Sequence, residues 1–436
     1  MSSDIAATER LGTAASSSPP VAANLDSPVR TWAILLLLSV GVMISFIDRT
    51  SLSAAMAVED FKVSFHLSDI DRGWINSAFF WTYALLQIPM GWIVDRYGVK
   101  WPFAICFALW CIASAATGLA TGFLGLMIIR LAVGGAEAIG VPASWRWIRN
   151  NFAEGQSGTA VGVYLLGAKI GPAVAPALVV WLIGISDWQT MFFVTGIGGL
   201  LWLVPWIVLV RNDRPTKVVD TQRQAQASAL PVRRLLKSPV VWGAMVVNFC
   251  YNYFTFYCMT WMPSYLVEQR GLSLGSMGLY TFFSFGGIAL VAVLAGAVAD
   301  RLISRGSDPV FTRKAFTLAG FLLASTVIMG AHTSSLEAAL FWNVASLSGL
   351  GLATANYMTL CRLTLIPKGS VGIVAGLQQV ATSLAGIIAP LLTGWLLQIS
   401  GSYTLPIDTI FVFLATGAAT TAFVLKEKWA PREDAV

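Results

Sequence analysis

The stretch Gly91-Trp92-Ile93-Val94-Asp95-Arg96-Tyr97-Gly98-Val99-Lys100 joins two long segments that carry no charged residue, 73–94 and 101–129. A helix that crosses about 30 Å of hydrocarbon needs about 20 apolar residues, so both flanking segments are long enough to span a bilayer. A backbone exposed to lipid has to satisfy its own hydrogen bonds, and this favours helices. The stretch therefore predicts a polar turn between two membrane-spanning helices.

A related turn occurs in the second half of the chain, Gly296-Ala297-Val298-Ala299-Asp300-Arg301, with Arg305 and Gly306 following. Between the two copies lies the longest polar stretch, 211–237, which holds seven basic residues. Two related halves are typical of transporters whose site lies between the halves. Glycine lets helices approach closely, and an aspartate and an arginine can pair across helix ends. We expect gating or structural roles for Gly91, Asp95, Arg96, Asp300 and Arg301.

The composition of the whole chain agrees with a membrane protein. Of 436 residues, 56% are hydrophobic and only 11% are charged, whereas a soluble domain carries about 25% charged residues. This excludes a soluble protein and predicts an all-α membrane protein with twelve transmembrane helices in two six-helix halves. The expected spans are 31–56, 72–95, 101–120, 122–145, 157–183, 188–211, 238–268, 273–301, 314–332, 336–361, 370–399 and 403–426.

The basic residues predict the orientation of these spans. If the N-terminus is cytoplasmic, the inner loops and tails hold 22 of the 28 lysines and arginines, Arg362 among them. Positive residues favour the cytoplasmic side, so both termini are expected there. The net charge of +6 follows from this bias, and we expect no nucleic-acid partner. The predicted parts are a disordered tail (1–30), an N-terminal bundle (31–211), an interdomain loop (212–237), a C-terminal bundle (238–426) and a second tail (427–436).

Five ionisable residues fall at membrane depth, where a charge costs about 3 kcal/mol or more and marks a functional candidate. They are Asp48, Arg49, Arg130, Glu137 and Lys169. Three are cationic and two are anionic, which suits an anionic substrate. Both histidines of the chain fall in predicted outer loops, so Asp48 and Glu137 are the candidates for proton coupling.

Two interpretations of this cluster stay open. It is either a static set of ion pairs that holds spans 1 and 4 together, or a proton relay combined with an anion clamp. Buried ion pairs stabilise less well than apolar packing does, so we favour the functional interpretation.

Several motifs resemble one family. They are Phe46-Ile47-Asp48-Arg49-Thr50, the stretch 81–89, Arg130 with Gly134-Gly135-Ala136-Glu137, the stretch 260–266, and Gly386-Ile387-Ile388-Ala389-Pro390. Together they resemble the anion:cation symporter family of the major facilitator superfamily. That family includes bacterial galactonate, glucarate and hexuronate carriers, and is similar to the vesicular glutamate transporters and sialin.

The resemblance implies roles for individual positions. Asp48 and Glu137 would exchange protons, Arg49 would meet the substrate carboxylate, and Arg130 would alternate between these carboxylates and the substrate. Tyr83 and Gln87 would offer hydrogen bonds to the substrate. Gln378 and Gln379 stand where the family has a Gln-Asn step, so the second glutamine departs from the pattern.

Lys169 is the larger departure, because the family usually places a small or amide residue there. Either it is a second cation for a dicarboxylate or it is a permanent partner of Glu137, and we favour the substrate role. Asn252 and Tyr257 in span 7 are further candidates for the cavity, with packing as the alternative.

The sequence thus predicts a secondary active transporter of the bacterial inner membrane that imports an organic anion, such as a sugar acid, with protons and by alternating access. The alternative is an exchanger or uniporter of mono- or dicarboxylates, including aromatic acids, on the same fold. No enzyme activity, metal or cofactor is expected. A monomer in the lipid bilayer should suffice.

Overall fold

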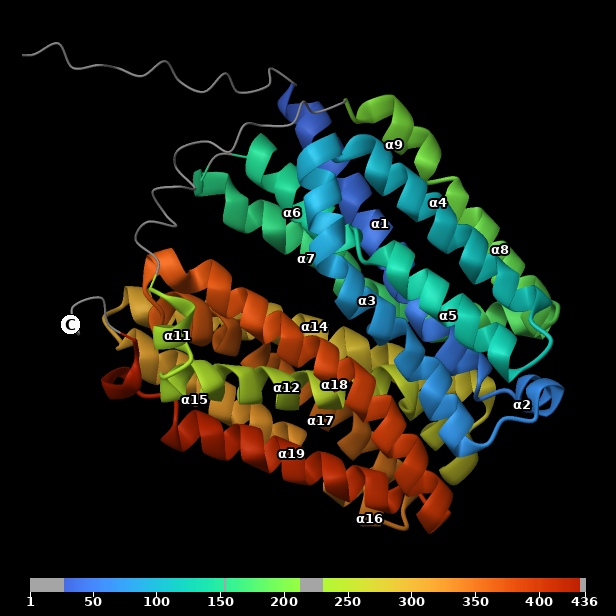
Figure 1. Cartoon of the computed structure of the whole chain (residues 1–436). Coiled ribbons are helices and arrows are strands. Elements are labelled where there is room, and N and C mark those ends of the chain that lie inside the picture. The colour runs from blue at the N-terminus through green and yellow to red at the C-terminus, as the bar shows by residue number, and fades with distance from the viewer. Residues whose placement is uncertain (1–26, 153, 212–229, 432–436) are drawn as a thin grey trace, which may run out of the picture.

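A computed structural model describes residues 27–152, 154–211 and 230–431, and the regular elements in these ranges are all helices (Figure 1). The first group comprises α1 (Pro28–Ala55), α2 (Glu59–Phe65), α3 (Asp69–Tyr97), α4 (Lys100–Ala116), α5 (Phe123–Glu137), α6 (Gly140–Asn151), α7 (Glu154–Ile185), α8 (Trp188–Leu200) and α9 (Leu203–Leu209). The second comprises α11 (Val232–Leu235), α12 (Pro239–Thr260), α13 (Met262–Ser264), α14 (Leu274–Ser304), α15 (Pro309–Ala324), α16 (Val327–His332), α17 (Leu336–Thr359), α18 (Val371–Ser400) and α19 (Thr404–Phe423). Two π-helical turns, Tyr265–Gln269 and Leu360–Thr364, follow α13 and α17.

Helix ends follow ordinary capping chemistry. Ser68 and Asp71 form a capping box at the start of α3, and Asp308 accepts a hydrogen bond from the Phe311 backbone at the start of α15. Such caps satisfy backbone donors that have no partner within the helix. Helix α3 ends at Gly98, whose φ of 82° is a conformation that favours glycine. The expected turn is therefore shorter than predicted, because 91–97 still belong to α3 and 296–301 lie within α14.

Eleven helical segments of the described chain are long and apolar enough to cross a membrane. They coincide with eleven of the twelve expected spans, and α5 with α6 together form one of them. Large apolar side chains point outward from these helices, with Ile88 84% exposed and Leu85 74% exposed. A hydrophobic exterior of this kind suits lipid rather than water. The chain is a multi-pass membrane protein.

The remaining expected span, 238–268, corresponds to α12, α13 and the following π turn, and it is not among the eleven. The 22 residues of α12 include Asn248, Tyr251, Asn252 and Tyr253, which lower its hydropathy. Most of α12 is buried against α18 and α19. A helix shielded from lipid by its neighbours can carry Asn248, Tyr251 and Asn252 because their side chains bond to protein groups instead.

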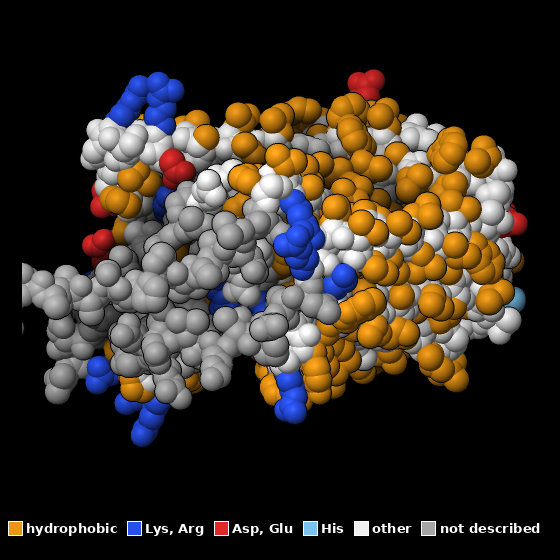
Figure 2. Space-filling view, turned by 90° about the horizontal axis from the view of Figure 1, so that it is seen from above, with side chains coloured by type: hydrophobic (Ala, Val, Ile, Leu, Met, Phe, Trp, Pro, Cys, Tyr) orange, Lys and Arg blue, Asp and Glu red, His pale blue; other side chains and the backbone are white. Residues whose placement is uncertain are grey.

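The two groups of helices diverge toward the upper left of Figure 1, at the end of the molecule where α1 begins and α19 ends. We call this the terminal end and the opposite one the far end. On the face shown in Figure 2, lysine and arginine lie on the left and along the middle, and the right part is mainly hydrophobic. The expected interdomain loop and tails include residues 1–26, 212–229 and 432–436, which lie outside the described residues.

The groups contact each other near the far end. Helix α3 packs along α18, and α7 packs along α14. Gly73 lies where a side chain would press on the carbonyl of Pro390, so its lack of a side chain lets α3 approach α18 closely. Phe80 of α3 stacks edge-on against Phe256 of α12, with ring centroids 4.6 Å apart.

Candidate functional site

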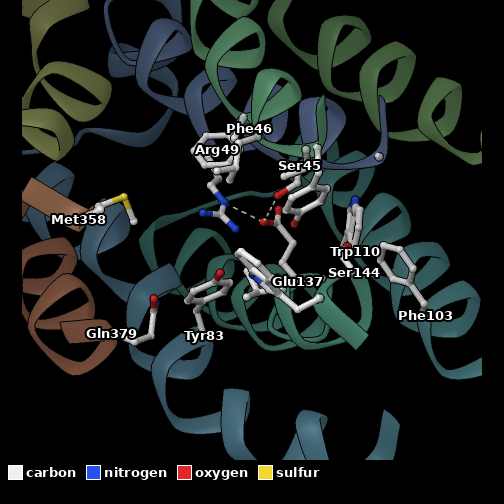
Figure 3. A pocket seen from close by; sticks show the side chains of 18 of the residues that line it. Ser45, Phe46, Arg49, Tyr83, Phe103, Trp110, Glu137, Ser144, Met358 and Gln379 are labelled. Atoms are coloured by element: carbon white, nitrogen blue, oxygen red, sulfur yellow. Dashed lines mark hydrogen bonds and ion pairs between the residues drawn. The ribbon is translucent and has the colours of Figure 1, made fainter. Parts of the chain in front are cut away.

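A cavity of about 230 Å³ lies between the two groups of helices. The first group contributes Arg49, Tyr83 and Glu137 to its wall, and the second contributes Met358, Arg362 and Gln379. Figure 3 shows Met358 and Gln379 on ribbons of the second group, across from Arg49 and Tyr83. A ligand in this cavity would therefore touch both groups.

An ion pair between α1 and α5 is the central feature of the wall. The Arg49 Nε lies 2.8 Å from Glu137 Oε2, and the Ser45 hydroxyl donates to the same oxygen at 2.6 Å (Figure 3). Ser45 precedes Arg49 by one helical turn, so both face α5. The other carboxylate oxygen, Oε1, is buried and accepts no hydrogen bond from the described protein. The carboxylate is thus held through a single oxygen.

Aromatic rings surround the Arg49 guanidinium. Its central carbon lies 4.7 Å from the Phe46 ring centroid, 4.6 Å from that of Phe79 and 4.8 Å from that of Tyr83. Rings at this distance attract a cation through their negatively polarised faces, and more strongly where water is excluded. The three rings contact Arg49 without neutralising its charge.

Asp48 and Arg49 point in different directions, as adjacent positions on a helix should. Asp48 is buried toward α4, where the Ser114 hydroxyl donates to it at 3.1 Å. Arg130 is buried too, and its guanidinium carbon lies 5.3 Å from the Phe79 ring centroid. In the described chain Arg130 forms no ion pair, so the expected contacts with Asp48 and Glu137 are absent from this conformation.

In the second group, Gln379 lines the cavity while Gln378 is fully buried behind it. The Gln378 side-chain oxygen accepts a hydrogen bond from Arg362 Nε at 2.5 Å. Arg362 was expected in an inner loop. It lies instead in the π turn after α17 and faces the cavity. Its proximity to Gln378 and Gln379 depends on tertiary packing, and no local pattern signals it.

Other expected site residues lie outside the lining of this cavity. Lys169 is half-buried and makes no hydrogen bond or ion pair with the described protein, Glu137 included. Gln87 is half-buried, with a side-chain nitrogen that has no partner in the described part of the chain. Asn252 donates to the Asn248 carbonyl at 2.7 Å. Tyr257 is 1% exposed and packs in the core of the second group.

The residues of the wall that were not expected include three with hydroxyl groups: Ser45, Ser144 and Tyr164. Gly167, adjacent to Ala168 in the lining, packs against the Ser39 carbonyl and sets how closely α7 approaches α1. The sequence signal for Ser45 was its one-turn spacing from Arg49. Nothing local distinguishes Ser144 or Tyr164 from other packed residues.

The aspartate of each repeated stretch forms an ion pair with an arginine of another helix. Asp95 of α3 lies 2.7 Å from Arg146 of α6, and Asp300 of α14 lies 2.8 Å from Arg313 of α15. Each pair joins helices of the same group. Arg96 stacks over Trp92 and Tyr97, Arg301 is exposed, and Gly91 faces Pro142. A latch role for Asp95 and Arg96 between the groups stays a prediction.

Residues 38–390 match the family model of the Major Facilitator Superfamily. The chain belongs to this superfamily. It is 29% identical to a D-galactonate transporter of Escherichia coli O6:H1 over 85% of this chain and 90% of that protein. It is 30% identical to a hexuronate transporter of Bacillus subtilis, covering 85% and 89% of the two chains. These relatives confirm the resemblance to the sugar-acid carriers of the superfamily.

The fold of this chain also matches solved structures. A bacterial homologue of the human lysosomal transporter Spinster, in an inward-facing and unoccupied conformation, superposes with a TM-score of 0.76 at 19% identity. The match covers 93% of this chain and all of that one. The chain therefore shares this fold along most of its length. The family model and the relatives are those of transporters and not of enzymes, so this chain is a transporter.

Proposed function

We propose that this transporter imports a small organic carboxylate, of the sugar-acid class, together with protons. The Arg49–Glu137 pair in the cavity wall is the observation that carries the proposal. The relatives that transport D-galactonate and hexuronate support the substrate class. Sugar acids combine a carboxylate with several hydroxyl groups, and the wall offers Arg49 for the first and Tyr83 and Gln379 for the second.

Coupling follows from competition for Arg49. A proton on Glu137 removes the negative charge that holds Arg49 at 2.8 Å and frees the guanidinium for the substrate carboxylate. When the proton leaves, the internal pair forms again and displaces the substrate. Asp48 is the second proton-exchanging group, and Arg130 pairs with either carboxylate or with the substrate in other states of the cycle. Protons are the only coupling ion in this scheme, and no cofactor takes part.

Alternating access would come from rocking of the two groups about the site. In this arrangement the terminal end is cytoplasmic, α12 is the seventh of twelve spanning helices, and Asp95 and Arg96 help to close the terminal end in the opposite state. Because the cavity lies within one chain, a monomer in the bacterial inner membrane is sufficient.

Replacing the carboxylate of Glu137 tests the coupling. In proteoliposomes with an acidic exterior, wild-type protein should accumulate D-galactonate above equilibrium. Glu137→Gln should lose this accumulation and reach only equilibration, because the amide cannot release a proton. Exchange of labelled for unlabelled substrate should persist in this variant. Glu337→Gln, at an exposed residue of the first turn of α17, is the matched control.

Full proton-driven accumulation by Glu137→Gln would refute its coupling role. If wild-type transport ignores the proton gradient but is stimulated by substrate on the opposite side, the protein is an exchanger and the symport proposal fails.

A further inference from the structure

Arg362 lines the cavity but has no role in the proposed coupling scheme. It lies in the π turn Leu360–Thr364, where Leu360 and Cys361 are fully buried and anchor the turn. A π turn inserts a residue into the helical repeat and so rotates the side chains that follow it; such turns are frequent at functional sites. Here Arg362 lines the cavity, while the preceding two side chains stay in the core.

The partner of Arg362 is neutral. Its Nε donates to the Gln378 side-chain oxygen at 2.5 Å, and it forms no ion pair with any carboxylate of the described residues. A hydrogen bond from a cation orients the group, but an amide leaves the positive charge in place. Arg362 is half-buried near the end of its helical segment, Leu336–Thr364, and its charge faces the cavity without a carboxylate beside it in the described residues.

Gln378 is itself fixed by a network of three helices. Asn248 of α12 donates to the Gln378 carbonyl at 2.6 Å, and Tyr357 of α17 donates to the Asn248 side-chain oxygen at 2.9 Å. Both residues are buried. The network ties α12, α17 and α18 together at the backbone of Gln378. The Gln378 side chain bonds to Arg362, and its own nitrogen has no partner in the described residues.

The charges of the cavity wall are therefore unequal between the two groups. The wall contains Arg49 and Glu137 from the first group, which neutralise each other, and Arg362 from the second, which nothing neutralises. When Glu137 takes a proton, two cations from opposite groups face one cavity. A ligand with one carboxylate satisfies only one of them.

We propose that Arg362 binds a second anionic group of the substrate, and that this transporter is selective for dianions such as aldaric acids over the corresponding monoanions. This inference rests on the proposed function and names the substrate class of the same site. The dianion would bridge the two groups of helices, one carboxylate at Arg49 and the other at Arg362. Lys169 was the expected second cation, but it does not line the cavity.

Galactonate and galactarate provide a matched pair of probes, because they differ only at C6, a hydroxymethyl group in the first and a carboxylate in the second. Purified full-length protein in proteoliposomes with an acidic exterior should take up galactarate in preference to galactonate. Arg362→Gln should weaken galactarate affinity about 10- to 100-fold, the loss expected for one hydrogen-bonded charge contact, and leave galactonate affinity nearly unchanged. Arg362→Lys should restore part of the preference.

Two comparisons make the result specific. Lys169→Gln should leave the galactarate-to-galactonate ratio unchanged, and so should Arg233→Gln, at an exposed arginine of α11. If Arg362→Gln does not fold, the wild-type protein still tests the inference, since galactarate should raise its thermal unfolding temperature more than galactonate does.

Equal losses for both probes in Arg362→Gln, or a wild-type preference for galactonate, would overturn the dianion inference while the proposed function stands. Uptake of neither probe, nor of other sugar acids, under any proton gradient would instead overturn the proposed function.

Discussion

At the scale of single residues, Phe79 connects the charged groups of the site with the packing of the helices. Its ring lies under the guanidinium groups of both Arg49 and Arg130, and its carbonyl faces Gly134 of α5. A Cβ atom added at Gly134 would collide with that carbonyl and with the Thr82 hydroxyl. The glycine therefore sets how closely α5 approaches α3, and with it the position of the ring that supports both arginines.

Gly134→Ala should therefore destabilise the protein, because the added methyl group would meet the Phe79 carbonyl, and a backbone carbonyl cannot move aside as a flexible side chain can. We expect a loss of about 1–3 kcal/mol, typical of overpacking, together with slower transport. The matched control is Gly125→Ala on the same helix, where the nearest atom, the Ala120 Cβ, lies 3.9 Å away. Thermal unfolding in detergent should separate the two variants, and equal unfolding temperatures would contradict the packing argument.

At the scale of elements, the far end is closed by polar contacts between α2, α3 and the π turn after α13. Glu268 of the turn lies 3.1 Å from Arg72 of α3 and 3.1 Å from Lys62 of α2, and it accepts a hydrogen bond from the Tyr403 hydroxyl at 2.6 Å. Arg72 also bonds to Asp69 and to Ser264. One carboxylate of the second group thus holds two cations of the first.

Acid should weaken this contact. Arg72, Lys62 and the Tyr403 hydroxyl all contact the ionised carboxylate of Glu268, and a proton on that carboxylate removes the negative charge that holds the two cations. The contact is therefore formed while Glu268 is ionised and is lost once acid protonates it. An acidic medium at the far end would then favour opening there.

Glu268→Gln should accordingly open the far end at neutral pH and remove the response to acid. Distances between spin labels at Ser64 and Ser400, two exposed positions on different groups, would measure the opening. Glu59→Gln is the control, because Glu59 pairs only with Lys62 within α2. Identical distances in Glu268→Gln and wild type would show that this contact does not hold the far end closed.

At the scale of the whole molecule, the cavity should be accessible from the terminal end only. The Phe80–Phe256 contact and the Glu268 cluster lie between it and the far end, whereas its wall continues along Val141, Ser144 and Trp145 of α6 toward the terminal end.

An Ala168→Cys variant, with Cys106 replaced by serine, tests this access because Ala168 lines the cavity. A membrane-impermeant thiol reagent should label it from the terminal side and much more slowly from the far side, and substrate should protect it. A Ser64→Cys variant should show the opposite sidedness. Equal labelling of Ala168→Cys from both sides would contradict a far end that is closed.

The spanning segments could be predicted from the sequence because lipid imposes a local requirement. Long uncharged runs such as 101–129 have to become helices wherever they are placed, and eleven expected spans match helical segments. The candidates Asp48, Arg49, Arg130 and Glu137 were visible for the same reason, since a charge inside such a run stands out without any knowledge of its partners.

The sequence by itself therefore determined the class of protein, the spans and the list of charges at membrane depth. Only the tertiary structure decided which of these groups meet. The Arg49–Glu137 contact joins residues 88 positions apart, and it depends on how α1 and α5 are rotated against each other. Arg362 reaches the cavity because a π turn redirects it, while Lys169 stays outside the lining. Hydrophobicity acts on each segment separately, but a site depends on the rotation and packing of segments against one another.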